Sequence, residues 1–309
     1  MATAATARVN QLLVDLEHDG ISLMPDFLSQ AQLESVVTAF ESRLRHQRWN
    51  DVDGYEKTMS YRHMVNDILA VDQGFVDAAL HPGVAEALRE YLGHDYELVE
   101  AKGWKSLPTK RDFHGWHGDA WYDQDKVASI PREVKLGIYL TDVNSGFFEY
   151  VRGSHRKQAP RQFRSGELAI DPAQVVQARG RAGSAFLFDT TGIHRQSVPI
   201  LERRYAVFFN YHSPSIPLQK EDVEYYRYHP LLLNAALLGD LSAEQRRVLG
   251  FGNKRNYIHA YVAKERYPKL HRAYEATFDL QIFLDGFSGR VRERLHRIVS
   301  SARRPSQQM

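Results

Sequence analysis

One triplet in this sequence combines the residue types and the spacing that metal chemistry needs. Of the 14 histidines, His117 alone begins a His-x-Asp/Glu triplet, His117-Gly118-Asp119. On an extended strand, residues i and i+2 point to the same face, so the imidazole and the carboxylate could bind one ion. With 38 acidic residues in the chain, about one or two such triplets are expected by chance. The triplet therefore needs support from its context.

His194 is the candidate for a third ligand. It follows a predicted strand at 184–188 and a turn at 190–192. Two histidines and one carboxylate on a β scaffold are typical of non-haem iron(II), because they leave three coordination positions open. A keto acid could chelate two of these positions and leave the third for O2. The ligand set therefore predicts Fe(II), with a keto acid and O2 as co-substrates.

Arg204, ten residues after His194, begins an apolar strand at 205–211. The far carboxylate of a bound keto acid needs a fixed cation, and arginine suits this role because its planar fork binds in two-pronged fashion and stays charged. A strand-edge arginine in a surface ion pair is the alternative. Strand alternation places Asn210 on the face of Arg204 and Trp121 on the face of His117 and Asp119. Asn210 and Trp121 are therefore candidate substrate contacts.

The elements that must position these residues are short strands between 96 and 211. Apolar runs separated by Gly, Pro, Asn and Asp predict strands at 98–104, 134–140, 147–151, 184–188 and 204–211. Strands without interleaved helices favour a sandwich, barrel or jelly roll over a parallel α/β sheet. Earlier, the sequence predicts helices at 8–18, 33–44 and 84–92 and a strand at 21–24. Two capping boxes are expected, at Ser29–Gln32 and Ser242–Gln245.

The fold class expected is mainly β with helical flanks (α+β), in a single domain over residues 1–309. A mainly helical part (1–95) precedes a jelly-roll core with the metal site (96–212). A helical C-terminal extension (213–299), with helical periodicity at 267–284, and a disordered tail (300–309) follow.

Composition excludes several classes of partner and site. With 40 Lys and Arg against 38 Asp and Glu, the net charge is +2, so no nucleic-acid partner is expected. The absence of cysteine excludes disulfides, cysteine zinc sites and thiol nucleophiles. No run approaches the about 20 apolar residues that span a bilayer, and the N-terminus lacks a signal-peptide core. We therefore expect a cytoplasmic protein with no membrane partner; the sequence does not specify an oligomeric state.

These motifs together resemble the phytanoyl-CoA dioxygenase family of iron(II)/2-oxoglutarate oxygenases over residues 10–212. The resemblance rests on the opening Asp19-Gly20-Ile21, on His117-Gly118-Asp119, on Leu140-Thr-Asp with Ser145-Gly146, on Gly153-Ser154-His155, and on His194 with Arg204. It implies a double-stranded β-helix, of the jelly-roll or cupin-like type. It also implies that substrate oxidation is coupled to conversion of 2-oxoglutarate to succinate and CO2.

The resemblance implies a role for each matching residue. His117, Asp119 and His194 would be the iron ligands, and Arg204 would hold the far carboxylate of 2-oxoglutarate. Relatives often carry serine two positions after the distal histidine, where this chain has Gln196, followed by Ser197. Either residue could take that place.

Two further residues, Tyr139 and Thr141, could face the co-substrate from a neighbouring strand.

Related halogenases replace the aspartate with a small residue, so the presence of Asp119 disfavours halogenation.

The predicted reaction is hydroxylation of a small-molecule metabolite, as in natural-product tailoring. Desaturation, cyclisation or epimerisation would use the same cofactors. A metal-dependent hydrolase or a non-catalytic jelly-roll binding module are the other classes. Residues 151–164 carry five cations and no acid, which fits either an acidic or carrier-linked substrate or a solvated loop.

Overall fold

The computed structural model of the chain describes residues 2–45, 60–112, 114–156, 168–218, 231–251 and a few positions from 269 to 280. Two compact units are present, residues 1–249 and 250–309. Every element named below belongs to the first unit. Most of the second unit lies outside the described residues, including most of the helix expected at 267–284. The predicted division into parts, with its helical extension and tail, therefore stays a prediction.

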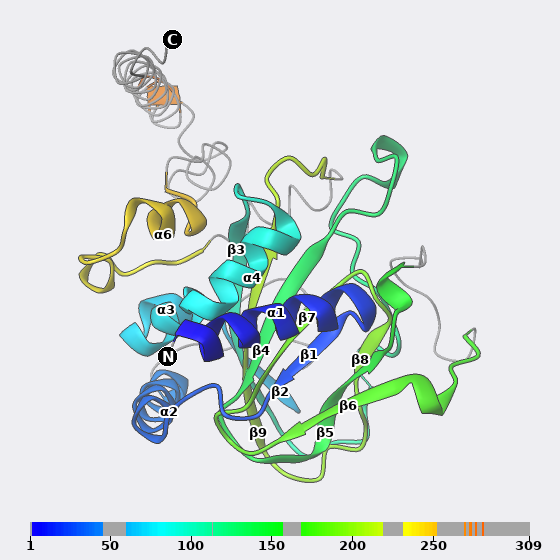
Figure 1. Ribbon diagram of the computed structural model, residues 1–309. Coiled ribbons are helices and arrows are strands. Elements are labelled where there is room, and N and C mark those ends of the chain that lie inside the picture. Colours follow the sequence, from blue (N-terminus) through cyan, green and yellow to red (C-terminus); the bar gives the residue numbers. More distant parts are fainter. Residues whose placement is uncertain are drawn as a thin grey trace. The chain divides into compact units, whose positions relative to one another are not determined.

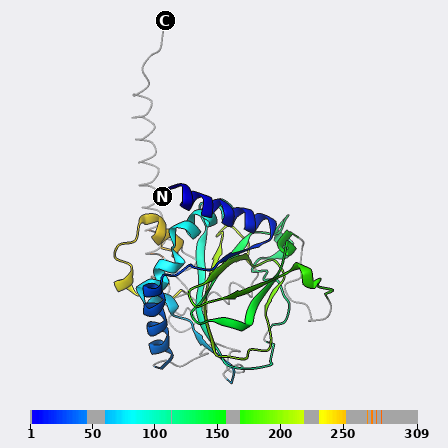
Figure 2. The ribbon, with the colours of Figure 1, turned by 60° about the horizontal axis from the view of Figure 1, so that its bottom comes forward.

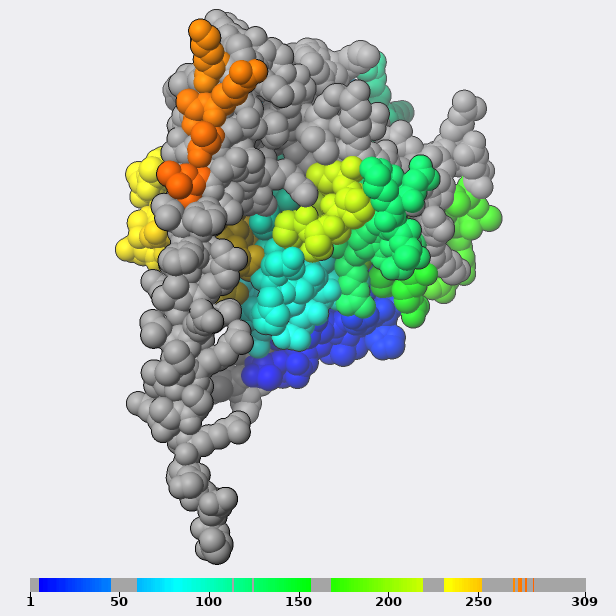
Figure 3. All heavy atoms as spheres, turned by 90° about the horizontal axis from the view of Figure 1, so that it is seen from above, coloured from blue at the N-terminus to red at the C-terminus, as the bar shows by residue number. Residues whose placement is uncertain are grey.

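Six antiparallel strands form the larger sheet, in the order β1-β7-β4-β9-β3-β2 (Figure 1). Their bounds are β1 (Ile21–Met24), β2 (Arg62–Val65), β3 (Glu97–Ser106), β4 (Glu133–Tyr139), β7 (Ala185–Asp189) and β9 (Arg204–His212). Strand β9 lies between β4 and β3, so segments remote in sequence become neighbours. Figure 3, a view from above, shows the regions where β4 starts (green) and β9 ends (yellow-green) together at the surface.

A smaller antiparallel sheet of three strands faces the larger one. It has the order β6-β5-β8, with the bounds β5 (Val143–Val151), β6 (Val175–Gly180) and β8 (His194–Gln196). The ring of Phe148 on β5 lies 4.8 Å from that of Phe186 and 4.3 Å from that of Phe188, both on β7. These contacts join the inner faces of the two sheets. The predicted class, an antiparallel jelly-roll core with flanking helices, is confirmed.

Helices cover the outer face of the larger sheet, as Figures 1 and 2 show for the blue and cyan segments. The α-helices are α1 (Ala2–His18), α2 (Gln30–Arg45), α3 (Gln73–Ala79), α4 (Pro82–Leu92) and α6 (Ala243–Val248). Short 3-10 helices occur at Ile68–Ala70, Gln124–Lys126, Ser154–Arg156, Pro172–Gln174 and Ala235–Leu237. Among the described residues, none of these helices could cross a membrane by length and apolarity.

Strand alternation decides which residues can reach the space between the sheets. On β4, Val134 and Leu136 belong to the core shared with the helices, whereas Tyr139 belongs to the core between the sheets. On β9, Val207 packs with the helices and Ala206 with the opposing sheet. The two-residue period of each strand therefore separates a helix-facing side from an inner side, as the sequence predicts for β9.

The elements predicted within the first unit are found near their expected bounds, and both capping boxes are present. The sequence did not predict β2, β6, β8 or α3. Strand β8 has three residues and β2 has four, which is too short for alternation to be recognised.

Candidate metal centre

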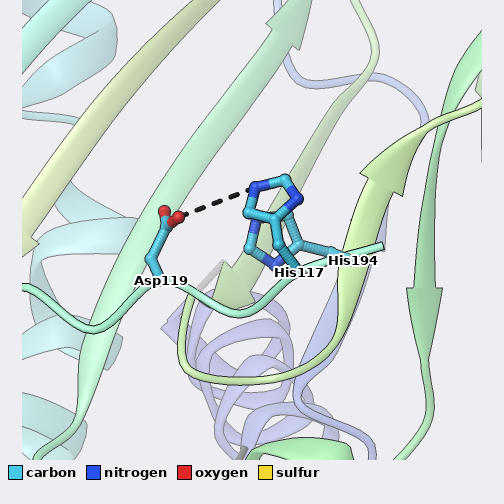
Figure 4. A group of neighbouring side chains, drawn as sticks. All are labelled: His117, Asp119 and His194. Atoms are coloured by element: carbon cyan, nitrogen blue, oxygen red, sulfur yellow. Dashed lines mark ion pairs between the residues drawn. The ribbon is translucent and has the colours of Figure 1, made fainter. Parts of the chain in front are cut away.

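Two histidines and one aspartate, distant in sequence, come together in the folded chain. The ligand atoms of His117, Asp119 and His194 all lie within 4.8 Å of one another. In Figure 4 the two imidazoles lie close together and the carboxylate of Asp119 points toward them. Asp119 Oδ1 is 3.7 Å from His117 Nε2, and the two imidazole centroids are 4.4 Å apart. The three side chains could therefore hold one metal ion.

Backbone hydrogen bonds tie the two ligand-bearing segments to each other. His117 N donates to His194 O at 2.9 Å, and His194 N donates to His117 O at 2.7 Å, which makes an isolated antiparallel bridge. Asp119 N donates to Thr190 O at 2.7 Å. The triplet thus lies in an extended loop paired with β8 and not in a regular strand, in contrast to the expected strand.

Two glycines set the course of this loop. Gly118 passes so close to the β7–β8 turn that a Cβ atom would lie 2.7 Å from Thr191 O. Gly115 has φ +64°, a left-handed conformation that interrupts strand alternation. As a result, the exposed His114 lines the same cavity as His117, with the ring centroids 5.0 Å apart. Strict strand alternation would point His114, three residues before His117, to the opposite face, and the turn at Gly115 is the reason that it does not.

The same ring nitrogen is hydrogen-bonded to the backbone in both histidines. His117 Nδ1 lies 2.9 Å from Gly115 O, and His194 Nδ1 lies 2.8 Å from Gly192 O. Because a carbonyl can only accept, Nδ1 carries a proton in each ring, and Nε2 is the nitrogen left to face a metal. Burial, together with the nearby His117, lowers the pKa of His194 to about 3. His194 is therefore neutral, the form that binds metals.

Asp119 is held in its charged form by a neighbouring cation. Burial alone would raise the pKa of its carboxyl group, but the charge of Lys135 holds this pKa well below its usual range. Lys135 Nζ donates to Asp119 Oδ2 at 3.1 Å. Burial alone would lower the pKa of Lys135, yet Asp119 and Glu100 raise it. Asp119 and Lys135 therefore form an ion pair beside the candidate ligands.

A second buried acid, Asp189, supports the turn before His194. Its Oδ1 accepts hydrogen bonds from Thr191 N at 2.9 Å and Thr191 Oγ1 at 2.6 Å, and its Oδ2 accepts one from Tyr91 Oη at 2.8 Å. Burial raises the pKa of Asp189 to about 6, although these hydrogen bonds act in the opposite direction. This acid fixes the turn and does not reach the cavity.

The three candidate ligands open into a cavity of about 240 Å³. It is lined by Arg62, Glu100, Lys102, Trp104, His114, His117, Asp119, Trp121, Lys135, Phe148, Phe188, His194, Arg195, Gln196, Arg204 and Phe208. Trp121 therefore stands on the wall of the site, as predicted. Charged side chains of both signs share the wall with aromatic rings.

Arg204 lies in the same cavity as the metal ligands and is buried, with 4% of its surface exposed. Its Nη2 donates to Gln196 Oε1 at 2.8 Å, and its Nη1 donates to Gly146 O. Its Nε has no hydrogen-bond partner, and in the described part of the chain no carboxylate pairs with the guanidinium. Burial lowers the pKa of Arg204. This buried cation lacks a counter-charge.

The remaining predicted site residues differ in where they lie. Gln196 lines the cavity, whereas the buried Ser197 does not, so Gln196 takes the place beside Arg204. The Tyr139 hydroxyl donates to a backbone carbonyl of β6, and Thr141 Oγ1 accepts from a backbone amide. Neither lines the cavity, and nor does Asn210, which is buried between β4 and β3. The contacts expected of Ser197, Tyr139, Thr141 and Asn210 with co-substrate or substrate therefore stay predictions, and in this structure none of the four lines the cavity.

Several cavity residues were not singled out from the sequence, above all Lys135, Glu100 and Lys102. Lys102 Nζ lies 2.8 Å from Glu100 Oε2, and both side chains are nearly inaccessible to solvent. A signal was present: charged residues alternate with apolar ones in strands that are otherwise buried. Such charges at inward positions mark a polar cavity wall.

The predicted basic run at 151–164 is only partly described. Arg152 pairs with Asp19 at the molecular surface. Residues 157–164 lie outside the described residues, so the choice between a substrate contact and a solvated loop stays open.

Comparison with known proteins identifies the family of the chain. The model of the phytanoyl-CoA dioxygenase family matches residues 16–196. The ectoine dioxygenase of Nocardia farcinica (strain IFM 10152) is 24% identical over 216 residues, which cover 60% of this chain and 71% of that protein.

Solved structures share the fold. SnoN, a non-haem alpha-ketoglutarate-dependent epimerase from nogalamycin biosynthesis, has a TM-score of 0.57 at 16% identity, over 73% of this chain and 91% of its own. HygX from Streptomyces hygroscopicus, with nickel, 2-oxoglutarate and hygromycin B bound, has a TM-score of 0.51 at 19% identity, over 68% and 89%. Since the family match spans more than half of the sequence, the chain belongs to the phytanoyl-CoA dioxygenase family and is an iron- and 2-oxoglutarate-dependent oxygenase.

Proposed function

We propose that this protein hydroxylates a small-molecule metabolite, with iron(II) held by His117, Asp119 and His194 and 2-oxoglutarate held by Arg204. One observation carries the proposal: a two-histidine, one-carboxylate cluster and a buried cation without a counter-charge line the same cavity. Iron alone would explain the cluster but not the cation. A keto acid with a second carboxylate explains both.

The cluster fits iron(II) by its donor atoms. Both imidazoles use Nδ1 for a backbone hydrogen bond, which leaves Nε2 for a metal, and Asp119 stays ionised. Three protein ligands of this kind leave three positions open on an octahedral ion. When bound there, iron supplies the activation of O2 that is coupled to decarboxylation of 2-oxoglutarate.

The buried guanidinium of Arg204 fits 2-oxoglutarate because it has no carboxylate partner among the described residues, and 2-oxoglutarate would supply one. An unpaired charge in a buried site is costly, and an anionic ligand removes that cost. Arg204 already donates to Gln196 and to a carbonyl, so its direction is fixed before the ligand arrives. The rings of Phe148 and Phe208 line the same cavity and give part of its wall an apolar surface.

The ligand set favours oxygenation over halogenation, because Asp119 occupies the position that a halide would need. Desaturation, cyclisation and epimerisation use the same ligands and co-substrates, and hydroxylation is the outcome proposed. A zinc hydrolase or a metal-free binding module has no use for Arg204 in this position.

The substrate proposed is a small polar metabolite, of the kind that natural-product tailoring enzymes modify. Glu100, Lys102 and Trp104 line the cavity together, so hydrogen-bonding groups and a flat apolar surface are both available. HygX is solved with hygromycin B, and SnoN with nogalamycin RO. An acidic or carrier-linked substrate is a narrower version of this proposal.

The test is anaerobic titration of the protein with iron(II) and then 2-oxoglutarate. A visible charge-transfer band of the iron–keto-acid chelate is expected, followed in air by succinate formation with accepted substrates. His194→Ala should show no band. If the wild-type protein binds iron without forming the band, the proposed role of 2-oxoglutarate is wrong.

A further inference from the structure

We propose that Lys135 restricts Asp119 to binding the metal through one oxygen, which keeps a coordination position open for O2. The proposal rests on the function proposed above, in which Asp119 is an iron ligand. It concerns how Asp119 binds, and it makes Lys135 a positioning residue because Lys135 acts through Asp119.

The two carboxylate oxygens of Asp119 face different partners. Oδ2 accepts the hydrogen bond from Lys135 Nζ at 3.1 Å. Oδ1 lies 3.7 Å from His117 Nε2, on the side where the imidazoles gather. A metal between the imidazoles and Oδ1 can therefore bind while Lys135 keeps Oδ2.

The carboxylate has little freedom to turn its second oxygen toward the metal. Asp119 N is fixed to Thr190 O, so the backbone cannot shift easily. The side chains of Asp119 and Lys135 are only 13% and 15% exposed. Any rotation that brought Oδ2 to the metal would break a buried, charge-assisted hydrogen bond.

Lys135 is itself held from three sides. It lies in the middle of β4, where it pairs with Phe188 of β7 and Asn210 of β9. Glu100, which pairs with the other side of Asn210, supplies a second negative charge near the ammonium group. The ion pair with Asp119 stabilises a buried ammonium group that would be costly alone.

One-oxygen binding matters because of coordination number. Two imidazoles and one oxygen leave three positions, of which the keto acid takes two and O2 needs the third. Were both oxygens of Asp119 bound, the keto acid would fill the remaining two positions and none would be left. Lys135 therefore keeps one coordination position open for O2, and it does not increase the affinity for the metal.

The inference can be tested with manganese(II), whose bound waters speed the relaxation of solvent protons. In Lys135→Met, Asp119 can turn both oxygens to the metal, and a neighbouring positive charge is gone. Manganese affinity should rise about tenfold, since the lost cation repelled the ion. The relaxation enhancement per bound ion should fall by about a third, and nearly vanish once 2-oxoglutarate is added.

Three variants complete the experiment. Lys135→Arg keeps a cationic donor and should restore the wild-type relaxation. Lys135→Gln is polar but one bond too short, so it serves as a second loss variant if Lys135→Met fails to fold. Lys105→Met removes a lysine from β3 that does not line the cavity, and it should leave manganese binding unchanged.

The manganese measurements separate a failure of the role given to Lys135 from a failure of the metal site. Weaker manganese binding in both loss variants, or unchanged relaxation per bound ion, would overturn the role given to Lys135. Wild-type manganese binding that survives His194→Ala would instead overturn the metal site itself. The two failures are thus distinguishable without measuring turnover.

Discussion

The two ends of the cavity are built on different principles. At the metal end, the ligands come from a loop and a three-residue strand, joined by reciprocal backbone hydrogen bonds. The charge of Asp119 is already matched by Lys135. At the other end, one side chain, Arg204, projects from a long central strand. It has hydrogen bonds, but no carboxylate among the described residues opposes its charge.

This difference assigns different tasks to the two ends. The metal end is complete as folded, so its geometry is set before any ligand binds. The Arg204 end is incomplete until an anion arrives, so it selects what may bind beside the metal. We therefore expect mutations at the first end to abolish the reaction, and mutations at the second to change its co-substrate requirement.

The largest effect is expected from the metal end. Asp119→Ala should weaken metal binding by about a thousandfold or more, since one of three protein ligands is lost. Asp123→Ala is the matched control. It removes an acid from the same loop, and that acid forms an ion pair with Lys126. Calorimetric titration with iron(II) or nickel(II) measures the difference. Retention of metal by Asp119→Ala would remove this residue from the ligand set.

At the other end, Arg204→Met should leave metal binding intact and raise the 2-oxoglutarate requirement about 100-fold. The loss corresponds to about 3 kcal/mol, the value of a charge-assisted, two-pronged contact. Arg203→Met is the control, because Arg203 is exposed and stacks outside on Tyr205. The rate of succinate formation, measured against the 2-oxoglutarate concentration, tests this prediction. If Arg204→Met needed no more 2-oxoglutarate than the wild type, the role assigned to Arg204 would be wrong.

A subtler change supplies the counter-charge that Arg204 lacks. Gln196→Glu should pair with the guanidinium, stabilise the protein by about 1 kcal/mol and weaken 2-oxoglutarate binding about tenfold. Gln196→Ala should weaken it only a few-fold. Thermal unfolding and 2-oxoglutarate titration, measured side by side, test whether stability and binding move in opposite directions. If Gln196→Glu gained both stability and affinity for 2-oxoglutarate, Arg204 would not be the residue that holds the co-substrate.

The smallest effect on the site is expected from Asp189, which lies behind the metal end. Its pKa is about 6 in the folded protein, above the usual 3.8, so the folded state holds this proton more tightly. Its contribution to stability is complete below pH 4 and is lost as the pH rises through 6.

In Asp189→Asn this decline should be absent, a difference of a few kcal/mol at most. Denaturant unfolding of the metal-free protein from pH 4 to pH 8 measures it. Parallel pH curves for the variant and the wild type would contradict the raised pKa.

Sequence pattern located much of the site because its motifs are local. His117 and Asp119 are two residues apart, and Arg204 begins the longest apolar run, so spacing and periodicity suffice. Lys135 and Glu100 could not be placed this way, because they meet the site only through the pairing of β4, β9 and β3.

Errors arose where parity was the sole argument. Tyr139 lies on the expected inner side of β4, but its hydroxyl is satisfied by the backbone of β6. His114 lies on the cavity side with His117, although the two are an odd number of residues apart, because Gly115 turns the chain between them. Two-residue alternation predicts which face of a strand a side chain is on. It does not predict how far the side chain reaches, or where a glycine with a positive φ interrupts the alternation.

The bridge between His117 and His194 links the supply of iron to the persistence of the folded protein. These two segments are far apart in sequence, and they meet only when β8 has docked beside the loop. An ion bound across them exists only in the folded state, so its binding free energy adds directly to the free energy of unfolding. With iron scarce, a larger fraction of molecules should open and be degraded. The metal would then govern the lifetime of this enzyme as well as its chemistry.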